Sequence, residues 1–358
     1  MTPRRILTTG TILASLAAAA TDPALPRTAR GTLAPLLLVR VVEDASRQPL
    51  PNAEVIDLDS GAHRFTNAAG EARVPWPDGG RIRLRVRELG FQFTDRELAR
   101  SAADGSVLDT VTIALTRVAY VLPNVTTSAT SQCASDADSA TKAMAVVALG
   151  QLRMGAERYE AFRKAYPFRI RQKRRTIRFL PTGVAREVRE TEEQESSDNW
   201  GEPYKPGHVL ERSAMGFSIP LLFLTSLANP VFWEHHCFAV RGAQSLYDDR
   251  VIRLEFAPAH NVTAVDWVGV AFVDSATSVL RRVEFQLAGL RDDDVPWRLE
   301  GYTTFRSPSP LIVIPDSTVA MWWRRDRTIP DAWTGPDVVQ LLRLVDVSYK
   351  KAKPAGVR

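Results

Sequence analysis

Apolar and polar residues alternate strictly in the first third of the chain. In residues 81–87, Ile82, Leu84 and Val86 alternate with four arginines. A period of two buries one face of a β-strand and leaves the other face in water. Residues 110–116 repeat this pattern, and the sequences NAAG (67–70) and DGG (78–80) are turn signals between strands. Short strands at regular spacing predict a β-sandwich over residues 35–122.

The apolar period changes between residues 136 and 165, after a polar linker at 123–135. A helix is predicted there, ending before Pro167. Gly150 and Gly155 lie inside it, so two shorter helices are an alternative. The apolar residues at roughly helical spacing are Met144, Val147, Leu152, Tyr159 and Phe162.

Residues 166–349 favour a second, mostly antiparallel β domain. Residues 168–180 and 184–195 are two charged strands around Pro181-Thr182-Gly183. This turn places Arg174 opposite Glu190, in a register that could shift by one residue, and the charge complementarity predicts a hairpin. The same register pairs Arg171 with Glu193 and Arg169 with Glu195. Further strands are expected at 251–256, 265–273, 279–287, 298–305 and 319–324. A last helix is expected at 337–347, before a basic tail at 350–358.

Two segments resemble known families. Pro51-Asn-Ala53, the turn at 66–70 and Gly90-Phe91 are similar to the carboxypeptidase regulatory-like domain, a transthyretin-like β-sandwich appended to many exported proteins. Thr66-Asn67 departs from that family's usual Thr-Asp. Residues 252–285, with GVAFVD and LRRVEF, are faintly similar to lipoprotein-carrier half-barrels, in which a curved sheet wraps an apolar hollow. These resemblances imply a fold and a compartment but no reaction.

The fold class expected is therefore mainly β with some α. It comprises an N-terminal transthyretin-like β-sandwich and a second, curved antiparallel sheet domain with helices. The 358 residues, of which 45% are hydrophobic, suffice for two domains with sizeable cores.

The N-terminus predicts export. Arg4 and Arg5 precede an uncharged stretch that ends in three alanines, which indicates a signal peptide over residues 1–20, followed by a leader at 21–34. A retained membrane anchor is the alternative. No later segment has enough uninterrupted apolar residues to cross a bilayer, so no transmembrane segment is expected in the mature chain. The net charge of +5 is too small to indicate a nucleic-acid partner. The expected location is the periplasm or the cell surface.

The two cysteines, Cys133 and Cys237, form an even pair in a chain expected to be exported. One disulfide is the simplest prediction, and two separate buried thiols are the alternative.

No catalytic residue and no cofactor are predicted. The chain has five histidines but no His-Glu-x-x-His, no Gly-x-Ser-x-Gly and no phosphate-binding glycine run. The densest group of ligand-type residues is Glu234-His235-His236-Cys237. A metal site would draw on His235 and His236, with a distant third ligand such as His208 or Glu255. The alternative is a strand edge on which the histidines pack beside Phe232.

Two sets of residues are candidates for binding. Arg81, Arg83, Arg85 and Arg87 lie on one strand face and could meet anionic glycan or lipid headgroups; otherwise they pair with acids on neighbouring strands. Trp297, Trp322 and Trp323 could stack on sugars, or belong to the core.

The function expected is that of a non-catalytic exported envelope protein. It would act as a binding or scaffolding module, with an envelope lipid, a glycan or another envelope protein as partner. Two alternatives remain open at this point. One is an accessory subunit or remnant of a zinc carboxypeptidase-like enzyme, and the other is a pure protein-interaction module.

Overall fold

The computed structural model describes residues 35–100, 108–119, 139–180, 182–197, 204–213, 216–220, 222–247, 249–259, 264–291, 296–309, 311–323 and 335–350. The predicted signal peptide, leader, linker, Cys133 and the basic tail beyond Lys350 lie outside these residues. Within them, no helix combines the length and apolar character needed to cross a membrane.

The first domain is a β-sandwich, as the alternating pattern predicts. A three-stranded sheet in the order β4-β1-β7 faces a four-stranded sheet in the order β3-β2-β5-β6. Val39, Val55 and Leu84 are fully or almost fully buried between the sheets. The strands are β1 (Leu36–Glu43), β2 (Glu54–Asp57), β3 (His63–Phe65), β4 (Glu71–Pro75), β5 (Arg81–Arg87), β6 (Thr94–Ala99) and β7 (Leu108–Leu115).

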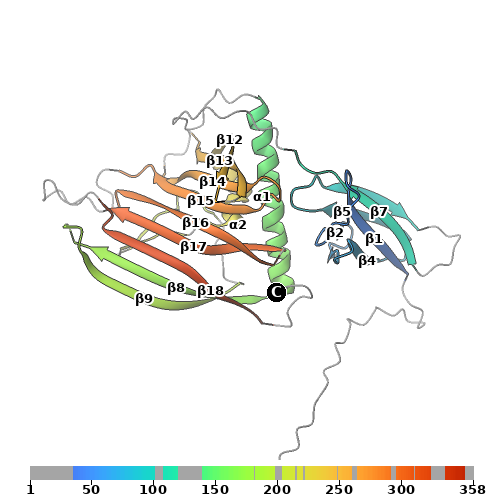
Figure 1. The fold of residues 1–358 in the computed structure, drawn as a ribbon, viewed down its shortest axis with the longest axis horizontal. Helices are drawn as coiled ribbons and strands as arrows, with labels where there is room; N and C mark the ends of the chain where they lie inside the picture. The colour runs from blue at the N-terminus through green and yellow to red at the C-terminus, as the bar shows by residue number, and fades with distance from the viewer. Residues whose placement is uncertain are drawn as a thin grey trace, which may run out of the picture.

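One unbroken helix, α1 (Ser139–Ala165), follows the sandwich, so the alternative of two shorter helices is wrong. It stands between the sandwich and the second domain (Figure 1). A Cβ on Gly155 would lie 3.6 Å from Leu224 and 3.8 Å from Leu89, one residue from each domain. Side chains of both domains therefore pack close to the helix at this position. Val147, expected on the buried face, is 40% exposed.

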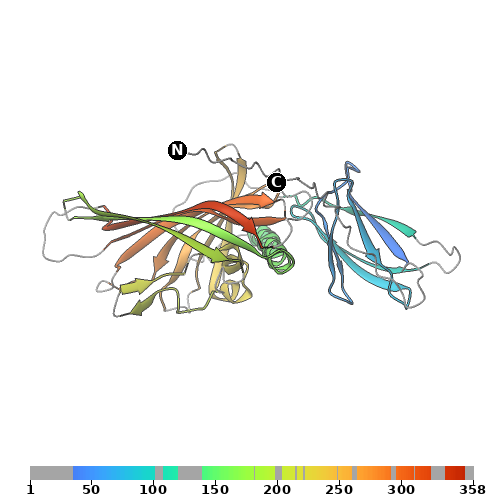
Figure 2. The ribbon, with the colours of Figure 1, turned by 90° about the horizontal axis from the view of Figure 1, so that it is seen from below.

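The second domain is a curved sheet of nine strands, all antiparallel, in the order β12-β13-β14-β15-β16-β17-β18-β8-β9 (Figure 2). Two short helices, α2 (Leu224–Leu227) and α3 (Pro230–His235), and a hairpin of β10 (Glu211–Ser213) and β11 (Gly216–Ser218) accompany it. The strands are β8 (Phe168–Phe179), β9 (Ala185–Ser196), β12 (His236–Leu246), β13 (Asp249–Pro258), β14 (Asp266–Asp274), β15 (Leu280–Ala288), β16 (Arg298–Ser309), β17 (Ile312–Trp323) and β18 (Val338–Tyr349).

The helix expected at 337–347 is wrong, because this segment is β18. It pairs with β17 on one side and with β8 on the other, and so completes the sheet. Val338, Leu342 and Leu344 are buried on one face of this strand. Hydrogen bonds to two neighbouring strands, which are not visible in the local pattern, decide between helix and strand here.

The predicted β8–β9 hairpin is confirmed, with its register displaced by one residue over most of its length. Near the turn Phe179 lies opposite Ala185, as the sequence predicts, but Arg174 lies opposite Thr191. A bulge adds Arg186 to β9 and shifts every later pair. The charges still meet, through diagonal and direct ion pairs: Arg171–Glu192, Arg174–Glu193, Arg175–Glu190 and Arg178–Glu187.

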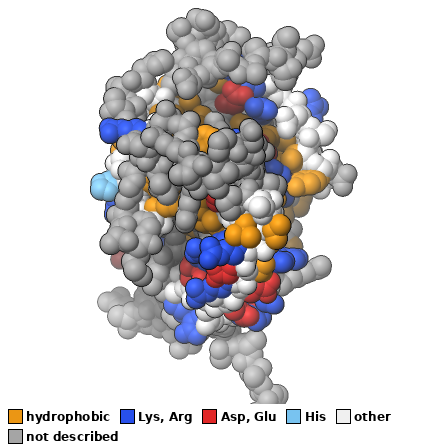
Figure 3. Space-filling model, turned by 90° about the vertical axis from the view of Figure 1, so that its left-hand side faces the viewer, with side chains coloured by type: hydrophobic (Ala, Val, Ile, Leu, Met, Phe, Trp, Pro, Cys, Tyr) orange, Lys and Arg blue, Asp and Glu red, His pale blue; other side chains and the backbone are white. Residues whose placement is uncertain are grey.

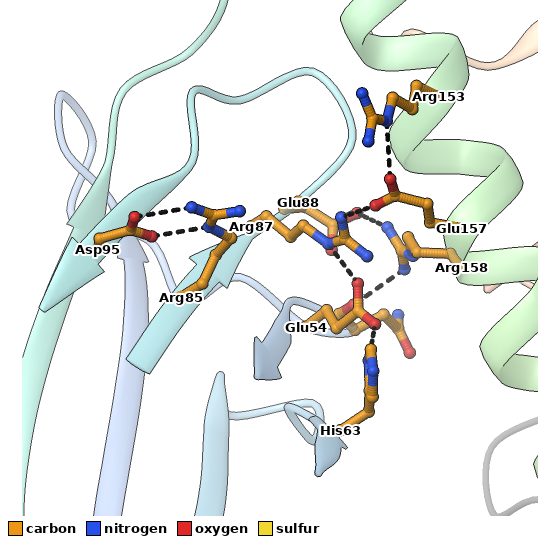
Figure 4. A network of polar contacts seen from close by, with 10 residues as sticks. Glu54, His63, Arg85, Arg87, Glu88, Asp95, Arg153, Glu157 and Arg158 are labelled. Atoms are coloured by element: carbon orange, nitrogen blue, oxygen red, sulfur yellow. Dashed lines mark hydrogen bonds and ion pairs between the residues drawn. The ribbon is translucent and has the colours of Figure 1, made fainter. Parts of the chain in front are cut away.

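A buried ionic network fastens the sandwich to α1 (Figure 4). Arg87 of β5 donates to Glu54 at 2.6 Å and also to Glu157 of α1. Arg158, which has no exposed surface, donates to Glu88 at 2.9 Å. Removing one partner of such a buried pair leaves an uncompensated charge, at a cost of about 3–5 kcal/mol. These contacts therefore oppose separation of the two domains.

The β14–β15 turn makes a second contact with the sandwich. Asp274 accepts hydrogen bonds from the backbone N–H groups of Ala276 and Thr277, at 2.9 and 2.8 Å, and so shapes the turn. The Ala276 carbonyl then accepts a hydrogen bond from Arg117 of the sandwich at 3.1 Å. A Cβ on Gly90 would lie only 2.9 Å from that carbonyl oxygen.

Gly90→Ala tests this contact, and Gly61→Ala is its matched control. Both glycines have positive φ, +83° and +69°, so each substitution carries the left-handed penalty of about 1–2 kcal/mol. Only Gly90 faces backbone from the other domain, since nothing lies within 4 Å of a Cβ on Gly61. We expect Gly90→Ala to lower the free energy of unfolding further and to separate the two domains' transitions in calorimetry. Equal losses for the two variants would contradict the close approach.

The stability that Asp274 contributes depends on pH. Burial alone would raise the pKa of Asp274, but hydrogen bonds from Arg281, Thr277 and Ala276 outweigh it and hold the pKa below its usual value. A lowered pKa stabilises the fold above the unfolded-state value, near 4, and this contribution is lost as the pH falls through the folded-state pKa. We expect Asp274→Asn to cost about 1–3 kcal/mol at pH 7 in urea unfolding. The difference from the wild type should shrink below about pH 4, and a constant difference would show that ionisation is irrelevant.

Candidate functional site

Alternate side chains along each strand point to the concave face of the nine-stranded sheet. Those of the central strands include buried apolar residues, which make this face apolar. Phe256, Gly269, Phe285 and Gly301 lie side by side across β13 to β16. A Cβ on Gly269 would lie 2.7 Å from the Phe256 ring, and one on Gly301 would lie 3.0 Å from the Phe285 ring. Each ring therefore lies over the glycine of the next strand, and together they form an aromatic floor.

The helices cover this floor. Leu152 of α1, Leu227 of α2 and Phe232 of α3 are at most 1% exposed and belong to the same apolar cluster as the floor residues. Burying each such side chain contributes about 1.5–3 kcal/mol. Of the three helices, α2 is a single turn, and its N-cap residue, Phe223, makes no side-chain capping bond. It is therefore the part of this cover with the least support of its own.

A small apolar pocket lies where α1 and α2 meet β16 and β17. Its volume is about 20 Å³, enough for one water molecule. The Thr225 hydroxyl is buried and has no hydrogen-bond partner among the described residues. An unpaired buried hydroxyl costs about 1–3 kcal/mol, so it weakens the closed arrangement of α2. The lining residues are Tyr159, Phe223, Leu224, Thr225, Phe305, Val313 and Pro315.

A buried polar triad lies beside the same core. Tyr204 donates to Asp266 at 2.5 Å, and His236 Nε2 lies 3.5 Å from the other oxygen of that carboxyl group. The His236 ring also stacks on Phe232, with centroids 3.8 Å apart. Burial raises the pKa of Tyr204 and of Asp266 and lowers the pKa of His236. Asp266 and His236 are almost completely buried, and the bonds of the triad join the α3–β12 junction to β14.

The three histidines proposed as metal ligands are not brought together. His236 is in the triad, His235 ends α3 with Nδ1 2.8 Å from the Val231 carbonyl oxygen, and His208 is well exposed, 3.9 Å from Glu211. The alternative of a strand edge is correct only in part: α3 ends at His235 and β12 begins at His236, but His236 does pack beside Phe232. His208 and Glu211 form a His-x-x-Glu pair that the sequence analysis missed. The described residues contain no group of three His, Cys, Asp or Glu that could hold a metal ion.

The arginines of β5 are engaged with acids. Arg83 contacts Asp59, Arg85 contacts Asp95 at 2.8 Å, and Arg87 belongs to the network at α1. Arg81 is exposed at the start of the strand. Whether the exposed members also bind an anionic ligand stays a prediction, but most of their charge is already balanced within the sandwich.

The three tryptophans do not form one platform. Trp322 packs edge-on against Phe217, whereas Trp323, the next residue on the strand, points to the opposite face beneath the Arg298 guanidinium. Trp297 donates its backbone N–H to the Trp323 carbonyl at 3.1 Å. Sugar stacking on these three tryptophans stays a prediction, and Trp322 and Trp323 lie on opposite faces of the sheet.

Cys237 lies on β12 and is not a free thiol. Its predicted partner, Cys133, lies outside the described residues, so the pairing of these two cysteines stays a prediction.

No protein-family model and no curated protein matches the chain. The solved structures that align with more than half of it include three at 10% identity. A DUF1329 family protein from Desulfovibrio piger covers 59% of this chain and 99% of its own, with a TM-score of 0.31. A LolA superfamily protein from Nitrosomonas europaea covers 58% and 97%, with a TM-score of 0.28. An outer membrane lipoprotein-sorting protein domain from Vibrio parahaemolyticus covers 57% and 95%, with a TM-score of 0.29.

TM-scores this low do not establish a shared fold or family. The second and third structures are of the lipoprotein-carrier kind that residues 252–285 resemble. None of the three is described as a carboxypeptidase regulatory-like domain, so that resemblance of residues 36–128 remains unsupported.

Tyr204→Phe tests the structural role of the triad, with Tyr349→Phe as the control. The first change removes a hydrogen bond to a buried carboxyl group and should cost about 1.5–3 kcal/mol in urea unfolding. The Tyr349 hydroxyl is also buried but has no hydrogen-bond partner among the described residues. Its removal should be neutral or stabilising. A Tyr204→Phe variant as stable as the wild type would mean that the triad does not hold this junction.

Proposed function

We propose that this chain is a non-catalytic, exported envelope protein that holds the acyl chain of a lipid between α2 and the concave face of its sheet. The observation that carries the proposal is the pocket at α2, whose lining is aliphatic or aromatic apart from the hydroxyl groups of Thr225 and Tyr159. The N-terminal pattern of Arg4, Arg5 and an apolar run supports export.

The apolar lining favours a lipid over a glycan. A sugar site needs several polar groups around an aromatic platform, whereas the side chains that line this pocket are hydrocarbon except for the hydroxyl groups of Thr225 and Tyr159. The convergent polar groups of the triad, Tyr204, Asp266 and His236, are not part of the pocket lining, and they are buried and bonded to one another or to backbone. Their arrangement supports a binding role in place of a catalytic one.

Ligand entry requires α2 to move, because about 20 Å³ holds no acyl chain. Lifting α2 exposes Leu224 and Leu227, at a cost of about 3–6 kcal/mol for two buried leucines. Each methylene group that a ligand buries returns about 0.8 kcal/mol. A chain must therefore bury roughly four to eight methylene groups before binding becomes favourable, and long acyl chains should bind where short ones do not.

Val313→Trp tests the pocket by filling it from β17. We expect this variant to lose at least about tenfold in affinity for a fluorescent long-chain fatty acid, because tryptophan occupies the space the chain would enter. Leu224→Ala should act in the opposite sense, since it enlarges the pocket and loosens α2. Binding is measured by fluorescence titration of the full mature chain.

Val146→Trp is the matched control, because Val146 is an exposed residue of α1, outside the pocket lining. Circular dichroism verifies that each variant is folded. If the wild type binds neither long-chain fatty acid nor phospholipid, the proposal is wrong and a pure protein-interaction module becomes the better interpretation. Equal affinity for short and long chains would contradict the opening of α2.

A further inference from the structure

The tip of the β8–β9 hairpin exposes apolar side chains to solvent. Leu180, Val184 and Val188 are 36%, 60% and 50% exposed. Val188 lies opposite Ile177 across the two strands, so the apolar surface continues onto β8. A group of aliphatic side chains on one protruding turn differs from the single exposed residues that any surface carries.

The turn holds these side chains at the end of the molecule. Leu180 donates its backbone N–H to the Val184 carbonyl at 2.8 Å, and Gly183, with φ of +79°, donates to the Leu180 carbonyl at 2.9 Å. The tip lies at the far end of the long axis from the sandwich (Figures 1 and 2). Seen from that end, apolar side chains border an area in which basic and acidic side chains are intermixed (Figure 3).

The tip is basic as well as apolar. Residues 175–189 contain four arginines and a single acid, Glu187. Arg186 is the extra residue of the bulge, between Val184 and Val188, and neither it nor Arg189 has a carboxylate partner in the part of the chain that the structure describes. The guanidinium groups of Arg186 and Arg189 therefore remain available to an anion from outside the protein.

We propose that this tip, residues 175–189, docks the protein on an anionic lipid surface. Leu180, Val184 and Val188 would enter the boundary between headgroups and acyl chains, and the arginines would meet lipid phosphates. A few apolar side chains with several basic ones give reversible attachment to anionic membranes. This inference does not depend on the ligand of the α2 pocket.

A lipid surface fits these residues better than a protein partner does. A stable protein interface buries about 800 Å² on each side, far more than three aliphatic side chains provide. The neighbouring edge strand is also unsuited to strand addition, since β9 beyond the tip carries Glu190, Glu192 and Glu193, and charges on an edge disfavour pairing with another chain.

The test is sedimentation of the full mature chain with vesicles of phosphatidylcholine alone or mixed with phosphatidylglycerol. We expect the wild type to bind the mixed vesicles and to dissociate as the salt concentration rises. Val184→Glu should reduce the partition coefficient at least about tenfold. Val146→Glu, a change of the same kind at a valine that is 69% exposed on α1, should leave it unchanged.

Insertion has a direct spectroscopic signature. The emission of Val184→Trp should shift to the blue on adding the mixed vesicles, and that of Val146→Trp should not.

Unchanged binding by Val184→Glu, equal binding to both vesicle types, or binding of the tip to a purified protein in place of lipid would each overturn the proposal. The hairpin variants should keep the fatty-acid affinity of the wild type, which separates failure here from failure of the α2 site.

Discussion

Nine antiparallel strands create an apolar concave face that cannot remain in water. The three helices cover it together with the segment that carries Tyr204, Val209 and Leu222, because all of them contribute side chains to one buried apolar cluster. The aromatic floor, in which the Phe256 and Phe285 rings lie over Gly269 and Gly301, sets how closely a helix can approach. The long helix α1 is one part of this cover, and its Leu152 belongs to the same buried apolar cluster as the floor. Another part of the cover is α2, which is one turn long and contains Thr225, a residue whose buried hydroxyl has no hydrogen-bond partner among the described residues. The contact between α2 and the apolar face thus contributes to the stability of the fold, and the proposed ligand entry requires the same contact to open.

The same helix serves the sandwich through a different kind of interaction. Its opposite side carries Glu157 and Arg158, whose partners on the sandwich are Arg87 and Glu88. Apolar contacts tolerate small displacements, whereas hydrogen-bonded ion pairs fix geometry. We infer that the sandwich holds α1 in place, so that a ligand displaces α2 and leaves α1 where it is. The β14–β15 turn, bonded to Arg117, adds a second attachment for the same purpose.

Local sequence patterns predict an element correctly wherever the side chains of that segment alone decide its structure. The alternation of Ile82, Leu84 and Val86 with arginines predicts β5, and the facing charges of β8 and β9 predict their hairpin. The apolar residues of 337–347 suit a helix as well as a strand, and only pairing with β8, some 170 residues earlier, settles the matter. The register of the hairpin depends on one extra residue, Arg186, which no charge pattern reveals.

The candidate site was harder to predict than the fold. His235 and His236 are adjacent in sequence and looked like ligands, yet the helix end between them sends one to the surface and the other into the core. The pocket combines Tyr159, Thr225 and Val313, which are widely separated along the chain and individually unremarkable. The curved hairpin of residues 266–288 could be expected from the sequence to line a hollow, but nothing local indicated which helix covers it.

Hydrogen exchange of the α2 backbone amides tests the central claim most directly. Without ligand, the amides of Thr225 to Ala228 should exchange much faster than those of β14 and β15, because a single weakly held turn opens often. With saturating long-chain fatty acid, the account predicts that α2 becomes protected while the sheet amides hardly change. Protection confined to the sandwich, or none anywhere, would contradict a lipid site beneath α2.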